Sequence, residues 1–176
     1  MFAVGWAAAI MAFVSWRRRH KELGGWLLFY YLLLYFNVVL GVVLLAGSLR
    51  TYLPSTWETA PDLYPWFLAS SVPGMLIVFV QLFVAEALRM KRTWAWVRRL
   101  IIVLGVDFLL SLMALAIDWQ YFPENVGINF KAMLFPLIWV TYFLRSKRVR
   151  RVLVTKDWGA PLVGQSGSAL TERPGT

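Results

Sequence analysis

The stretch that decides the fold is "IWVTYFLRSKRVRRVLV", residues 138–154. Its first half is almost entirely apolar, and its second half alternates cations with valine and leucine. Two interpretations fit such a junction: a transmembrane helix that leaves the bilayer into a basic flank, or a basic patch that binds nucleic acid. The composition and charge pattern of the rest of the chain favour the first.

Composition indicates that the chain is surrounded by lipid. Of its 176 residues, 60% are apolar, 16% aromatic and only 15% charged, whereas soluble domains have about 45–50% apolar and about 25% charged residues. So little polar surface would leave apolar side chains exposed to water, so lipid is the expected solvent. Cysteine is absent and His20 is the sole histidine, and the sequence shows no nucleophile–base pair and no phosphate-binding loop. We therefore predict no enzymatic activity, no catalytic residue, no metal site and no cofactor.

The net charge of +9 is concentrated in three short clusters, residues 17–21, 89–99 and 145–156, each beside a long apolar run. The connections between alternate runs carry acidic residues instead, namely Glu58, Asp62, Asp118 and Glu124. This alternation is the positive-inside pattern, which reflects the orientation of a membrane protein and not affinity for nucleic acid. We predict a multi-pass protein of the bacterial inner (plasma) membrane whose C-terminus is cytoplasmic and which binds no nucleic acid.

Four segments are long and apolar enough to span a bilayer: residues 25–48, 66–88, 100–117 and 127–144. At about 1.5 Å per residue they reach about 27 to 36 Å, which matches a hydrocarbon core of about 30 Å. Backbone polar groups in lipid must be satisfied within the segment, so these spans should be α-helices. The predicted fold is an all-α polytopic membrane protein. In it, residues 23–156 form a four-helix transmembrane bundle and residues 157–176 a disordered cytoplasmic tail.

Residues 1–22 are predicted to form an additional short apolar helix and a basic turn. As a helix, residues 1–16 would be about 24 Å long, which is short for a span. Three interpretations are open: a thin transmembrane span, a helix lying in the interface, or a disordered leader. A signal peptide is disfavoured because the positive charges follow the apolar run instead of preceding it.

The opening stretch is therefore interpreted as a transmembrane exit. Trp139 and Tyr142 belong to the fourth helix, and the cations that follow stay in the cytoplasm. Past Ser146, cations alternate with Val149 and Val152. This mixture is typical of a short amphipathic extension that lies along the lipid headgroups.

The same stretch carries a family resemblance. Together with "ELGGWLL" (22–28), "WVTYFLRSKRVRRVLV" (139–154) resembles the bacterial membrane proteins grouped as domain of unknown function 2569. Members begin the first helix with a similar Leu-Gly-Gly-Trp-Leu and end the fourth with a similar Tyr-Phe-Leu-x-Ser-Lys-Arg-Val. Thr141 stands where the family motif has a proline, and the apolar leader before Arg17 is longer than usual. The resemblance implies a four-helix inner-membrane protein and brings no assigned activity.

Asp107 is an acidic residue inside the third apolar segment. It lies nine positions beyond Arg98, which is about 13 Å into the membrane along a helix. A charged side chain at the centre of a membrane-spanning helix costs roughly 2.5–3.5 kcal/mol, so a specific role is expected. Two roles are open: relay of protons or cations, or a buried carboxyl that ties helices together.

Small and polar residues form a stripe on each of three predicted helices, with the spacing i, i+4, i+11. The stripes consist of Asn37, Gly41 and Ser48; of Ser70, Gly74 and Gln81; and of Asp107, Ser111 and Asp118. Such stripes are typical of helix–helix interfaces in lipid. They therefore indicate packing more directly than they indicate a transport pathway.

Two further charged residues lie within or beside the spans. Glu86 is three residues before Arg89 and predicts an ion pair at the membrane surface. Lys131 is expected to extend its side chain outward to the interface. A pair between Lys131 and Asp107 would have to bridge about 7 Å of membrane depth.

The cations beside the spans are predicted to bind anionic lipid headgroups, at about 1 kcal/mol each. They are Arg89, Lys91, Arg92, Arg98, Arg99, Arg145, Lys147, Arg148, Arg150 and Arg151. The favoured function is that of a small accessory or scaffold subunit. Such a subunit acts through contacts with lipid and with another membrane protein or a second copy of itself.

The alternative function is that of a small oligomeric transporter or channel. Its polar path would use Asp107, Asn37 and Gln81. Kinks at Pro73 and Pro136 would free backbone carbonyls to line a cavity.

Overall fold

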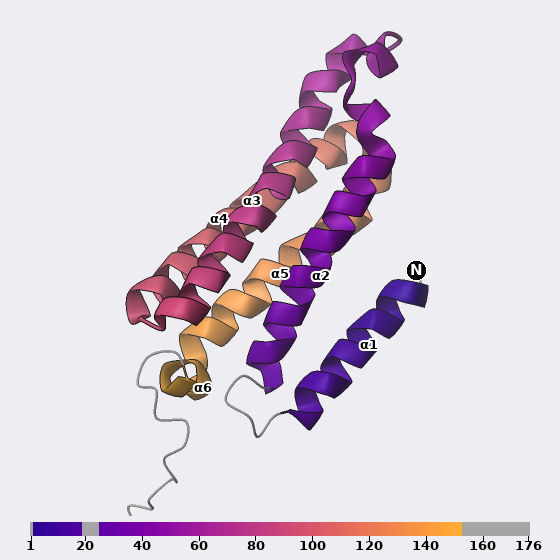
Figure 1. Cartoon of the computed structure of the whole chain (residues 1–176). Helices are drawn as coiled ribbons and strands as arrows, with labels where there is room; N and C mark the ends of the chain where they lie inside the picture. Colours follow the sequence, from indigo (N-terminus) through magenta and orange to yellow (C-terminus); the bar gives the residue numbers. More distant parts are fainter. Residues whose placement is uncertain (1, 19–24, 153–176) are drawn as a thin grey trace, which may run out of the picture.

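The computed structural model describes residues 2–18 and 25–152, which form helices and their connections with no strand (Figure 1). The helices are α1 (Phe2–Arg17), α2 (Gly25–Ser48), α3 (Tyr64–Lys91), α4 (Trp94–Tyr121), α5 (Val126–Arg145) and the short α6 (Lys147–Arg150). Four of them, α2 to α5, are long and apolar enough to cross a membrane. The structure confirms the predicted all-α bundle with an additional N-terminal helix. The predicted tail, residues 157–176, lies outside the described residues.

The two ends of the bundle differ in charge. The basic end holds the end of α1, the start of α2, the α3–α4 turn and α6, with the cations of residues 17–18, 89–99 and 145–151. The loop end holds the remaining connections, which are short 3₁₀ helices: η1 (Leu49–Tyr52), η2 (Pro54–Trp57), η3 (Pro61–Leu63) and η4 (Pro123–Asn125). Proline begins three of these four, because it fits the first position of a helix but interrupts a longer one.

Helices α3 and α4 form a hairpin joined by a turn of two residues, Arg92 and Thr93. Arg92 adopts the left-handed conformation (φ 47°) and donates its backbone N–H to the Leu88 carbonyl at 2.9 Å, which ends α3. The sequence predicts a connection over residues 89–99, but most of these residues extend the two helices. They can do so because long cationic side chains reach interfacial water from within a helix.

The apolar core lies in the basic half of the bundle. At its centre, the Tyr30 ring of α2 meets Trp139 and Phe143 of α5 edge to face, with centroids 4.8 Å and 5.0 Å apart. Aromatic pairs of this geometry contribute about 0.5–1.5 kcal/mol beyond their burial. The core consists of Leu27, Tyr30, Tyr31, Leu34, Val84, Ala85, Leu88, Val97, Leu100, Leu104, Trp139, Phe143, Val149 and Val152. All four spanning helices contribute to it, so this half is held by close packing.

The loop half is packed less closely. Among the described residues, the apolar side chains that are buried toward the loop end are Ile77, Ala114 and Phe122. Phe122 meets Trp57 and Phe67 in an aromatic cluster that closes this end. On α2, no residue from Tyr35 to Ser48 is buried. The rest of the bundle therefore covers the loop half of α2 only partly.

Helix α1 lies beside α2 at the basic end (Figure 1). It is a formed helix of 16 residues, contrary to its interpretation as a disordered leader. Of its described side chains, only Ser15 is buried, whereas Trp6, Ile10 and Phe13 are exposed. These exposed apolar side chains suit a lipid environment.

Helix α6 forms the predicted amphipathic extension. Val149 and Val152 are fully buried against the core, while Lys147 and Arg150 are exposed. The Val149 N–H donates to the Ser146 hydroxyl at 3.3 Å, which caps the start of α6. The basic flank of the fourth span thus folds back onto the bundle.

Candidate functional site

Two of the three polar stripes meet between α3 and α4. Gln81 Nε2 donates a hydrogen bond of 2.7 Å to Asp107 Oδ2, and both side chains are buried. Antiparallel helices joined by a two-residue turn bring residues at similar distances from that turn face to face. The hairpin therefore places Gln81 of one stripe beside Asp107 of the other.

The Gln81–Asp107 pair lies near the middle of both helices. Asp107 is 9% exposed and Gln81 is 1% exposed, so the bond joins α3 to α4 within the membrane-spanning part of the bundle. Gln81 Oε1 is buried and has no hydrogen-bond partner among the described residues. The geometry favours the second role open to Asp107, a buried carboxyl that ties helices together.

Asp118 forms a second buried pair, between α4 and α5. The sequence places Asp118 in the connection after the third span, but α4 continues to Tyr121 and Asp118 is 1% exposed. Asn129 of α5 donates a hydrogen bond from Nδ2 to Asp118 Oδ2. Helix α5 thus supplies a hydrogen-bond partner to Asp118 Oδ2, whereas Asp118 Oδ1 is buried without a partner among the described residues. Asn129 is absent from the predicted stripes, although an amide near the start of an apolar helix is a usable signal.

The stripe on α2 has no counterpart on another helix. Asn37 is half-buried, and its side chain forms no hydrogen bond with any described residue. A Cβ added at Gly41 would meet nothing within 4 Å. On α4, Ser111 is also half-buried. The structure thus brings together Gln81, Asp107 and Asp118 with their partners and leaves Asn37 outside this set.

The structure contains the predicted ion pair between Glu86 and Arg89. Glu86 Oε2 forms an ion pair with Arg89 Nη2 at 2.6 Å and also accepts a hydrogen bond from the Tyr35 hydroxyl through Oε1. Lys131 is exposed and forms no ion pair with a described residue. The alternative pair of Lys131 with Asp107 is not formed, because Gln81 is the partner of Asp107.

The predicted headgroup-binding cations form the surface of the basic end. The exposed ones are Arg89, Lys91, Arg98, Arg99, Arg145, Lys147, Arg150 and Arg151; Arg92 is half-buried, and the side chain of Arg148 lies outside the described residues. Arg99 and Lys91 lie over the Trp96 ring, 4.3 Å and 4.9 Å from its centroid. Cation–π contacts at exposed sites contribute about 0.5–1 kcal/mol, so Trp96 concentrates positive charge at the surface.

In the described part of the chain, no group of three or more His, Asp or Glu side chains could hold a metal ion. The chain matches no family model, no curated protein and no solved structure. The resemblance to domain of unknown function 2569 stays a prediction. The case for a function therefore rests on the geometry of the bundle.

Proposed function

We propose that this integral membrane protein is a small, non-enzymatic accessory or scaffold subunit of the bacterial inner membrane. It acts by packing the loop half of α2 against a helix of another membrane protein and by binding anionic lipids at its basic end. In this orientation the basic end and the C-terminus face the cytoplasm. The observation that carries the proposal is a seam of α2 that its own bundle covers fully in the basic half and only partly in the loop half.

The seam is one continuous face of α2. Leu27, Tyr30 and Leu34 are spaced by three and four residues, and Asn37 and Gly41 continue the same spacing. Residues spaced in this way lie on one side of a helix and form the seam along which helices pair. In the basic half the seam is buried, whereas Asn37 and Gly41 are only half-buried. The same face is therefore fully covered at one end and only partly covered at the other.

Asn37 specifies the kind of partner that fits. It lies about 18 Å from the start of α2, near the middle of a bilayer. An amide in lipid is costly unless its donor and acceptor are used, and asparagine side chains hydrogen-bond across transmembrane helices. Gly41 lies one turn away from Asn37, and because it has no side chain a second backbone can approach closely there. A partner helix with a hydrogen-bonding side chain at mid-membrane would meet both requirements.

The hydrogen bonds of the two buried carboxyls support a structural role for the polar residues of α3, α4 and α5. Asp107 is tied to Gln81, and Asp118 is tied to Asn129. Interhelical hydrogen bonds in membranes contribute about 0.6 kcal/mol on average. These residues hold α3, α4 and α5 together, which makes the hairpin and α5 a platform that positions α2.

Cysteine cross-linking tests the proposed contact. The chain has no cysteine, so Gly41→Cys introduces a single thiol on the seam. We expect this variant to form a disulfide adduct in native membranes with a partner that carries a cysteine at the facing position. The mass of the adduct distinguishes another membrane protein from a second copy. The adduct should be lost when Asn37→Leu is added.

The matched control is Leu109→Cys. Leu109 is 63% exposed on α4 and lies within its apolar segment, away from the seam. Equal adduct yields from Gly41→Cys and Leu109→Cys would contradict the proposal, because they would reflect random collisions in the bilayer.

The alternative function, a small oligomeric transporter or channel, is favoured by the alignment of Asp107 and Asp118 on α4, both of which are buried. It is tested by reconstituting the purified chain into vesicles and measuring proton and cation flux. A flux that Asp107→Asn abolishes would replace the accessory function with transport. The proposed function predicts vesicles no leakier than protein-free ones.

A further inference from the structure

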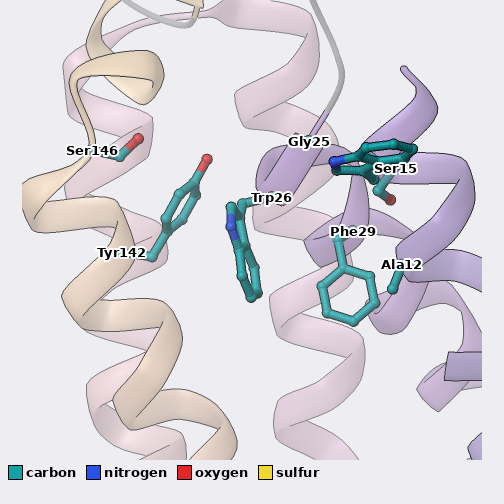
Figure 2. A pocket seen from close by; sticks show the side chains of 8 residues that line it. Ala12, Ser15, Gly25, Trp26, Phe29, Tyr142 and Ser146 are labelled. Carbon is teal, nitrogen blue, oxygen red and sulfur yellow. The ribbon is translucent and has the colours of Figure 1, made fainter. Parts of the chain in front are cut away.

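A cavity of about 520 Å³ lies at the basic end, between α1, α2 and the end of α5. Its lining residues are Ala12, Ser15, Trp16, Gly25, Trp26, Phe29, Tyr142 and Ser146. Figure 2 shows Tyr142 and Ser146 on one side of the Trp26 ring and Phe29, Ala12 and Ser15 on the other. Cavities of about 300–1,000 Å³ are the size that binds small molecules.

The lining combines apolar walls with a hydroxyl that has no partner. Ala12, Trp26 and Phe29 supply apolar surface from two helices. Ser15 is 3% exposed, and its hydroxyl is buried without a hydrogen-bond partner among the described residues. A buried hydroxyl without a partner is destabilising, and a ligand acceptor would relieve that cost. The cavity is therefore suited to a ligand that is apolar along its length and polar at one end.

Two arginines are adjacent in sequence to residues that line the cavity. Arg17 follows the lining residue Trp16, and Arg145 precedes the lining residue Ser146. Both arginines are exposed, and neither forms an ion pair with a described residue. Helix α2 begins at Gly25, which itself lines the cavity and has a φ of 58°. The first backbone N–H groups of a long helix bind anions, so the polar end of the ligand should be anionic.

Two exposed indoles indicate where the ligand enters. Trp26 is 62% exposed and Trp16 is 60% exposed, although both line the cavity. Tryptophan is enriched where the headgroups of a membrane meet its hydrocarbon. The cavity thus opens at the depth at which a lipid has its phosphate on one side and its acyl chains on the other.

We propose that this cavity binds one anionic glycerophospholipid of the surrounding leaflet. One acyl chain lies along Ala12, Trp26 and Phe29. The phosphate accepts hydrogen bonds from the Ser15 hydroxyl and from the start of α2, and Arg17 and Arg145 supply the charge that distinguishes anionic from zwitterionic lipids. The site rests on the proposed binding of anionic lipids at the basic end, but it is separate from the seam of α2 and does not depend on the proposed partner helix.

Native mass spectrometry of the purified full chain in mild detergent tests the site. The probes are phosphatidylglycerol and phosphatidylcholine with identical acyl chains. We expect one tightly held phosphatidylglycerol and an apparent Kd about tenfold lower than for phosphatidylcholine. Ser15→Ala should weaken phosphatidylglycerol binding about fivefold to tenfold, because it removes one hydrogen bond to a charged group. Ala12→Phe, which fills the cavity, should abolish tight binding of both lipids.

A matched pair of double variants separates the site from general attraction to positive charge. Arg17→Gln with Arg145→Gln should remove the preference for phosphatidylglycerol. Arg50→Gln with Lys131→Gln removes the same charge from exposed residues toward the loop end, away from the cavity, and should leave the preference intact. Thermal unfolding in the same detergent confirms that each variant is folded.

Three outcomes would overturn the proposal. Equal losses in the two double variants would show that the preference comes from overall charge. Tight lipid binding in a folded Ala12→Phe variant would place the lipid outside the cavity. Displacement of phosphatidylglycerol by millimolar inorganic phosphate would identify a free anion as the ligand.

Discussion

In the basic half of the bundle, Tyr30 of α2 packs between Trp139 and Phe143 of α5, whereas in the loop half the same face of α2 carries Asn37 and Gly41 and no buried residue. The loop half is held instead by the aromatic cluster around Phe122 and by the hydrogen bond between Asn129 and Asp118. One helix therefore passes from a packed environment to a partly covered one along its length.

This difference shows how a small bundle can be stable and still offer a surface for association. In lipid, burial of apolar groups between helices gains little over contact with acyl chains, so close packing and hydrogen bonds decide which helices associate. The core of the basic half supplies the packing. The partly covered seam of α2 retains a polar amide for another helix.

The largest expected effect concerns the two ends of the bundle. The clustering of cations at one end predicts that this end is cytoplasmic and that the loop end is external. Reporter fusions after Thr59, at the loop end, and after Lys156, beyond the basic end, should report opposite compartments. If both fusions report the same compartment, the count of four spans is wrong. The charge difference between the two ends then does not predict the orientation of the protein.

Packing in the basic half should be the next most sensitive feature. Leu100 is fully buried in the core, whereas Ile102, two residues along the same helix, is 64% exposed. Leu100→Ala should lower the free energy of unfolding by about 2 kcal/mol, because it opens a cavity that the core fills only partly. Ile102→Ala should change it by less than about 0.5 kcal/mol. Reversible unfolding in mixed micelles measures both, and equal losses would mean that the core is not closely packed.

The buried Gln81–Asp107 pair should have a smaller effect. Asp107→Leu removes the acceptor and leaves the Gln81 amide without a partner, so we expect a loss of about 1 kcal/mol in the free energy of unfolding. Asp107→Asn keeps an oxygen that accepts the hydrogen bond and should stay within about 0.5 kcal/mol of the parent. Mixed-micelle unfolding compares the two variants. If both unfold like the parent, Asp107 does not tie α3 to α4.

The smallest expected effect separates two tyrosines one turn apart on α2. The Tyr31 hydroxyl donates to the Ala85 carbonyl at 2.9 Å and is buried, whereas Tyr35 is 41% exposed and donates to Glu86. Tyr31→Phe should lower the free energy of unfolding by about 0.6 kcal/mol, and Tyr35→Phe by an amount near zero. A larger loss for Tyr35→Phe would extend the packed half of α2 further toward the loop end.

Much of the fold was predictable because it depends on local composition. The predicted first span, residues 25–48, coincides with α2 (Gly25–Ser48), since a lipid-spanning helix must be continuous and apolar. The basic ends of α3 and α4 were predicted less well. Arg89, Lys91 and Arg98 look like a connection in composition, yet they extend the helices because their side chains can reach water.

Because residues 89–99 were interpreted as a connection, the candidate site could not be predicted. With a connection over residues 89–99, the stripes on α3 and α4 have no defined register, and Gln81 is not recognisable as the partner of Asp107. The two-residue turn sets the register, because it fixes which residues lie at similar distances from it along the two helices. Asp118 was misplaced for a related reason: α4 continues past it, and its hydrogen-bond partner Asn129 comes from another helix.

The sequence by itself determined the helical class, the membrane spans, the charge difference between the ends and the polar stripes, because each follows from the transfer of local segments between water and lipid. The tertiary structure decided which stripes meet, where the core lies and that α1 encloses a cavity against α2 and α5. These features depend on the angle and register at which helices pack. In lipid, apolar burial alone does not favour one helix arrangement over another. Side-chain fit and hydrogen bonds between distant residues therefore determine how the helices pack.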